Sequence, residues 1–140
     1  HMTSSRLSLA ADARDSILSH AREGAAGDPP AEVCGVLAGD SDARTVTAAH
    51  PVSNVAAEPR VAYELDPEET VSILEAIESA GDDAVGFYHS HPESDPVPSA
   101  TDRERASWPG YVYLICSPDG RMTAHEWTGD EFRELSVAVE

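Results

Sequence analysis

The sequence predicts an α/β domain built on a mixed β-sheet flanked by helices, and two observations support this fold class. Short apolar runs that suit strands alternate with amphipathic segments that suit helices, and neighbouring runs are joined partly by hairpin turns and partly through a helix. The chain has 140 residues, a length typical of one domain that buries its own core. We therefore expect residues 1–140 to form a single domain.

The first half of the chain is expected to hold one helix followed by three strands. Apolar residues recur near the helical period over residues 7–23, and the sequence GAAGDPP then ends that helix. Residues 33–38 form a short apolar run typical of a buried strand, and residues 43–52 alternate well enough to be its hairpin partner. A loop at 53–60 leads to a third short strand at 61–65.

The second half begins with an expected helix, and the residue types at its start predict where it begins. Asp66 suits the N-cap position and Pro67 the first helical position, and apolar residues then continue to Ala80. The remaining expected elements are, in order, a strand at 84–90, a short helix at 99–106, a buried strand at 111–117 and two closing strands at 122–127 and 132–139.

The charge balance excludes some classes of partner. The chain carries 26 acidic residues against 9 basic ones, a net charge of −17. Because binding to nucleic acid requires a basic patch that neutralises phosphates, we expect no nucleic-acid partner, and the same argument excludes an anionic membrane surface. The acidic residues are spread along the chain, which is typical of a protein adapted to high salt, and an ordinary acidic protein is the alternative.

The sequence predicts a cytoplasmic protein. No apolar run reaches the roughly 18 residues of a membrane span, and the polar segment after Met2 lacks the apolar core of a secretory signal. His1 is interpreted as a cloning remnant. Cys34 and Cys116 are far apart in apolar runs and are expected to be small buried residues, with a redox or site-lining role for Cys116 as the alternative.

The segment Y-H-S-H-P at the end of the 84–90 strand carries two histidines one residue apart. Residues i and i+2 of a strand point to the same face, so the imidazoles of His89 and His91 can converge on one point while Ser90 points away. The end of a strand is also a common place for ligand sites in α/β sheets. Two metal ligands are one interpretation of this pair, and two partly exposed loop histidines are the other.

Ser99 and Asp102 also allow two interpretations. Ser-x-x-Asp before a helix is typical of a capping box, in which both side chains only bind backbone groups. A side chain on the first helical turn is also held rigidly, and it can reach the nearby histidines. Two imidazoles and one carboxylate would form a three-ligand set with an open fourth position, the pattern of catalytic zinc.

A hydrolytic metal site also needs a carboxylate that accepts a proton from water. Glu32 stands at the edge of the apolar run VCGVLAG, where a carboxylate requires a partner or a purpose. A solvated acid at the strand edge is the alternative. Glu93 and Asp95 are nearer to the histidines in sequence, but their proline-rich loop aims them poorly.

Together these residues resemble a known signature. Glu32, the H-S-H-P segment with His89 and His91, and S-x-x-D with Ser99 and Asp102 are similar to the JAMM motif, the MPN+ signature of zinc isopeptidases. EVCGVLAG resembles the glutamate-bearing strand of that family, and SNVAAEPRVAYELDPEE resembles its segment before the second helix. The resemblance therefore covers nearly the whole chain.

The resemblance implies an MPN/JAB1 domain, a three-layer αβα sandwich similar to cytidine deaminases. It implies that His89, His91 and Asp102 bind one Zn²⁺ with water as the fourth ligand. It further implies that Glu32 is the general acid/base and that Ser99 helps to hold the oxyanion.

The implied function is hydrolysis of isopeptide, and possibly linear peptide, bonds after the C-terminal Gly-Gly of ubiquitin-like modifier proteins. The small archaeal members of the family from halophiles, the desampylases, are the most similar in size and charge. Hydrolysis of a cysteine adduct of a sulfur-carrier protein is the alternative within the same chemistry. A non-catalytic MPN scaffold is the alternative of another class.

Overall fold

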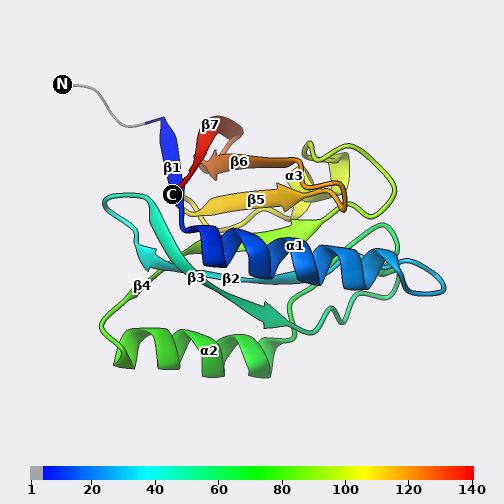
Figure 1. Ribbon diagram of the computed structural model, residues 1–140, viewed down its shortest axis with the longest axis horizontal. Helices are drawn as coiled ribbons and strands as arrows, with labels where there is room; N and C mark the ends of the chain where they lie inside the picture. Colours follow the sequence, from blue (N-terminus) through cyan, green and yellow to red (C-terminus); the bar gives the residue numbers. More distant parts are fainter. Residues whose placement is uncertain (1–4) are drawn as a thin grey trace.

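The computed structural model describes residues 5–140, so the interpretation of His1 lies outside the described residues. The described chain forms helices around one strongly curved sheet (Figure 1). In order, its elements are β1 (Arg6–Leu9), α1 (Ala11–Ala25), β2 (Cys34–Asp40), β3 (Thr45–Val52), α2 (Pro67–Ser79), β4 (Asp83–Ser90), α3 (Ala100–Arg105), β5 (Val112–Cys116), β6 (Met122–Trp127) and β7 (Phe132–Val139).

The strands form a mixed sheet in the order β1-β3-β2-β4-β5-β6-β7, and β1 also pairs with β7, so the sheet closes on itself. The pair of β4 and β5 is parallel because α3 and its flanking loops connect the two strands, whereas β2 and β3 form an antiparallel hairpin. This arrangement confirms the predicted mixed sheet flanked by helices. It also places the ends of β4 and β5 side by side, with Ser90 opposite Cys116.

Two clusters of buried apolar side chains hold the helices against the sheet. α1 contributes Ala13, Ile17 and Ala21 to the larger cluster, and α2 contributes Ile77 to the smaller one. Figure 1 shows β2 and β3 passing between the two helices. Phe87 and Tyr88, near the end of β4, pack into different clusters, so their side chains point to opposite faces of the sheet and the residues that follow continue this alternation.

The predicted helix at 7–23 begins later than expected, because residues 6–9 form β1. Leu7 and Leu9 are both fully buried, and Leu7 lies opposite Val137 of β7. Two leucines around Ser8 satisfy a strand as well as a helix over so few residues. Pairing with β7, near the end of the sequence, makes these residues a strand and not a helix.

The predicted strand at 61–65 is wrong. Only an isolated bridge joins Leu65 to Asn54, and the backbone between them is irregular. The Asn54 amide donates to the carbonyl of Ala62 at 3.1 Å and accepts from the amide of Glu64 at 3.0 Å. One side chain thus binds backbone groups that a neighbouring strand would otherwise bind.

The expected start of the second helix and the expected burial of both cysteines agree with the structure. Asp66 caps α2 by accepting a hydrogen bond from the amide of Glu68, and Pro67 is the first helical residue. Cys34 and Cys116 are buried free thiols, and burial raises their pKa values to about 12 and about 11, so both stay protonated. Within residues 5–140, no helix is long and apolar enough to cross a membrane.

Candidate active site

The end of β4 positions two imidazoles on one side and a serine on the other. His89 and His91 are 1% and 4% exposed. Ser90 points away, as the strand alternation predicts, and its hydroxyl accepts a hydrogen bond from the amide of Val33 at 2.9 Å. The amide of Ser90 also donates to the carbonyl of Val33 at 3.0 Å, so residue 33 is held twice against the strand end.

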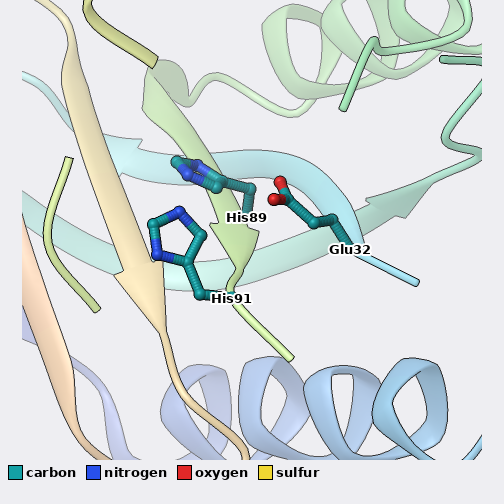
Figure 2. A group of neighbouring side chains, drawn as sticks. All are labelled: Glu32, His89 and His91. Carbon is teal, nitrogen blue, oxygen red and sulfur yellow. The ribbon is translucent and has the colours of Figure 1, made fainter. Parts of the chain in front are cut away.

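These two hydrogen bonds between Val33 and Ser90 place the neighbouring Glu32 close to the histidines. The side chain of Glu32 is 5% exposed, which excludes the alternative of a solvated acid at the strand edge. Donor atoms of Glu32, His89 and His91 all lie within 4.8 Å of one another, a group that can hold a metal ion. Figure 2 shows the carboxylate of Glu32 directed toward His89, with His91 beside that imidazole.

Asp102 belongs to the same cluster and also caps α3. Ser99 and Asp102 form the predicted capping box, with the Ser99 hydroxyl accepting from the amide of Asp102 at 3.0 Å and Asp102 Oδ2 accepting from the amide of Ser99 at 2.9 Å. The same Oδ2 lies 3.1 Å from Nε2 of His89 and 3.1 Å from Nε2 of His91. The two interpretations of this motif are therefore compatible.

The hydrogen bond on the far side of His91 determines which nitrogen of the neutral ring carries the proton. Nδ1 of His91 lies 2.8 Å from the carbonyl oxygen of Asp95, and because a carbonyl only accepts, Nδ1 must donate. In the neutral ring, Nε2 then presents a lone pair to the Asp102 oxygen at 3.1 Å. Such a contact needs a proton or a metal ion. Donors bound tetrahedrally to zinc are about 3.3 Å apart, close to the observed separations.

The pKa values of Asp102 and Glu32 are shifted in opposite directions. Burial raises the pKa of Asp102, but hydrogen bonds from His89 and His91 outweigh it and hold that pKa well below its ordinary range. Burial lowers the pKa of His91, yet the Asp102 and Asp95 contacts outweigh it and leave that pKa raised. Burial lowers the pKa of His89. In Glu32, burial dominates and raises the pKa to about 8, while His91 opposes it.

The raised pKa of Glu32 predicts a pH-dependent stability in the metal-free protein. Between the unfolded pKa near 4.3 and the folded value of about 8, only the unfolded state releases the proton, so stability falls as pH rises through this window. Glu32→Gln, which cannot ionise, should remove this loss, an effect on the order of a few kcal/mol. Urea unfolding of both metal-free proteins at pH 5, 6.5 and 8 measures it, and parallel pH curves would contradict it.

Three residues that the sequence reasoning did not assign also shape the site. Ser90 fixes Val33, as described above, and its place between the two histidines was the available signal. Asn54 donates from its amide to the carbonyl of Glu32 at 2.9 Å. The ring of Tyr63 stacks on the imidazole of His89, with centroids 4.3 Å apart. Asn54 and Tyr63 carry no local pattern, because their partners lie far away in the sequence.

The fold and this cluster together define a JAB/MPN-type domain with a candidate metal-binding centre of histidine and carboxylate side chains at a strand end. The sequence matches the family described as prokaryotic homologs of the JAB domain over residues 10–129. The chain belongs to this family, which confirms the resemblance and the fold that it implied.

Curated relatives in this family are peptidases. The chain is 34% identical over 111 residues to the CysO-cysteine peptidase of Mycobacterium tuberculosis, covering 79% of this chain and 73% of that protein. It is 35% identical over 106 residues to the desampylase of Pyrococcus furiosus, covering 75% of this chain and 71% of that protein. The two identities are nearly equal, so they favour neither activity over the other.

Solved structures show the same fold. A protein of Desulfitobacterium hafniense superposes with a TM-score of 0.82 at 26% identity, covering 96% of this chain and 92% of that one. A JAB1/MPN domain protein from Archaeoglobus fulgidus superposes with a TM-score of 0.57 at 17% identity, covering 94% and 96%. The second likeness concerns the fold alone.

Proposed function

We propose that the protein is a zinc-dependent peptidase that hydrolyses the isopeptide bond after the C-terminal Gly-Gly of a ubiquitin-like modifier protein, in the manner of a desampylase. One observation carries this proposal. A single Asp102 oxygen lies 3.1 Å from Nε2 of both His89 and His91, in a buried cluster that also contains Glu32.

His89, His91 and Asp102 would hold the ion, and Glu32 would remain outside that set. Asp102 is the better ligand because its pKa lies well below the ordinary range, so it is charged at neutral pH, and because the amide of Ser99 fixes its oxygen. When bound, zinc polarises the scissile carbonyl and lowers the pKa of water to about 7. Glu32 would have a lower pKa beside a bound cation and could then accept a proton.

Glu32 and Ser99 would perform the proton transfer and hold the developing charge. Glu32 accepts a proton from the attacking water as the new C–O bond forms, and returns it to the leaving nitrogen as the C–N bond breaks. The Ser99 hydroxyl oxygen accepts from the amide of Asp102, which leaves its proton for the oxyanion. Such a donor contributes about 2.7–4 kcal/mol to stabilising the transition state.

Burial of the site favours glycine next to the scissile bond. With His89 and His91 almost inaccessible, a substrate backbone without side chains approaches them most easily. A cleft of about 500 Å³ lies nearby between α2 and the segment after α3, and Tyr63 both lines it and touches His89. Its other lining residues include Phe87, Trp108 and Tyr111, which suit apolar residues of an extended peptide.

The acidic composition favours the archaeal modifier over the cysteine adduct. Excess acidic charge is tolerated where high salt shortens the Debye length to about 3 Å at 1 M. The net charge of −17 therefore supports an enzyme that works in the cytoplasm of a salt-rich cell. A sulfur-carrier protein bearing a C-terminal cysteine remains the second candidate substrate, because a relative of nearly equal identity bears that activity in its name.

Cleavage assays with two substrates test this proposal. One is a modifier joined through Gly-Gly to a lysine side chain, and the other is a sulfur-carrier protein ending in Gly-Gly-Cys. We expect mass spectrometry to show faster cleavage of the first, loss of cleavage on chelation, and recovery when zinc is restored. Equal cleavage by the metal-stripped protein would contradict the metal role. Cleavage of neither substrate would favour the non-catalytic scaffold.

A further inference from the structure

The two imidazoles of the cluster are held in different ways. His91 donates from Nδ1 to the carbonyl of Asp95 at 2.8 Å, the usual way of orienting a metal-binding histidine. Nδ1 of His89 is buried, and within residues 5–140 no hydrogen-bond partner reaches it. The ring of His89 therefore needs another support if Nε2 is to stay directed at Asp102.

Tyr63 provides that support by ring stacking. Its ring lies nearly parallel to the imidazole of His89, at an interplanar angle of 20° and a centroid distance of 4.3 Å. A flat aromatic surface at this distance restricts rotation of the imidazole about its outer side-chain bond, which otherwise has a broad energy minimum.

Tyr63 is itself fixed from both sides. The side-chain amide of Asn54 donates to the carbonyl of Ala62 and accepts from the amide of Glu64, the two neighbours of Tyr63. The same amide group donates to the carbonyl of Glu32 at 2.9 Å. One asparagine thus ties the backbone that carries the stacking ring to the backbone that carries the buried carboxylate.

We propose that Tyr63 is a positioning residue for the metal site, which holds His89 in its ligating orientation through the face of its ring. This inference rests on the proposed function, because it assumes that His89 binds the ion. Tyr63 acts through the face of its ring, so a phenylalanine at this position should support His89 equally well.

Zinc affinity measured with variants of two cleft residues tests this role. Tyr63→Leu should weaken Zn²⁺ binding about 10–100-fold, whereas Tyr63→Phe and the control Tyr111→Leu should stay within about twofold of the unaltered protein. Tyr111 lines the same cleft, but its ring stacks on Phe87. Dissociation constants come from competition with a chromophoric chelator, and thermal unfolding of each metal-free variant shows that it is folded. Tyr63→Met is measured in parallel, so the result does not depend on one variant folding.

The outcomes separate this inference from the proposed function. If the unaltered protein binds no zinc, the proposed function falls and the inference falls with it. If the unaltered protein binds zinc and both Tyr63→Leu and Tyr63→Met bind it equally well, only the inference is overturned. Weak binding by Tyr63→Phe would also overturn it, because the ring would then not be the supporting group.

Discussion

Glu32→Gln should lower kcat about 10²–10⁴-fold while zinc content stays unchanged, because an amide cannot accept the proton of the attacking water. The substitution keeps the size of the side chain in a position that is 5% exposed, so the fold should be retained. Rates measured at saturating Gly-Gly isopeptide, together with zinc content by elemental analysis, check both parts of this prediction.

Glu93→Gln is the matched control for this experiment. Glu93 follows the histidines closely, but its side chain is 45% exposed and its carboxylate binds Arg60 at 2.6 Å and 3.0 Å. Its loss should change kcat by less than about twofold, since exposed ion pairs contribute little. A Glu32→Gln protein that keeps its rate, or that loses its zinc, would show that Glu32 is not the base.

Asp102→Asn should abolish zinc binding and activity together. Losing only an orienting partner of a ligand costs about 10–100-fold in metal affinity, and losing a charged ligand should exceed that. The metal-free variant should still fold, because an asparagine keeps the shape of the side chain and its oxygen can accept from the amide of Ser99. Equilibrium dialysis against buffered zinc gives the affinity.

Ser99→Ala distinguishes the two roles of this motif. It removes one bond of the capping box and should cost about 1 kcal/mol of stability, yet leave zinc affinity unchanged.

If Asp102→Asn kept its zinc while Glu32→Gln lost it, the ion would be bound by Glu32, His89 and His91 instead. That set is also close enough to hold an ion, so the pair of experiments decides between two real alternatives.

Local rules explain why much of the site could be predicted from sequence. Alternation along a strand places His89 and His91 on one face, and the spacing of Ser99 and Asp102 predicts a cap. Neither rule says that the cap and the histidines meet. That contact joins the first turn of α3, which lies in the connection between β4 and β5, to the end of β4, and neither local pattern contains it.

What the sequence could not predict rests on distant partners. Local sequence places Leu7 and Leu9 in a helix, because the strand that pairs with them, β7, lies more than 120 residues further along the chain. The stacking of Tyr63 on His89 and the bond from Asn54 to Glu32 join segments that share no periodic pattern. These residues lie in an irregular segment, where propensity carries little information about side-chain direction.

The capping of α3 has a consequence for how ligands communicate. A helix of six residues has little stability of its own, so its order depends on the bonds at its first turn. Asp102 makes those bonds, while Arg105 at the other end of α3 lines the aromatic cleft. In the proposed enzyme, an ion and a peptide would therefore bind to opposite ends of one cooperative unit. Thermodynamic reciprocity then requires that any change which the ion makes in the affinity for the peptide be matched by an equal change which the peptide makes in the affinity for the ion.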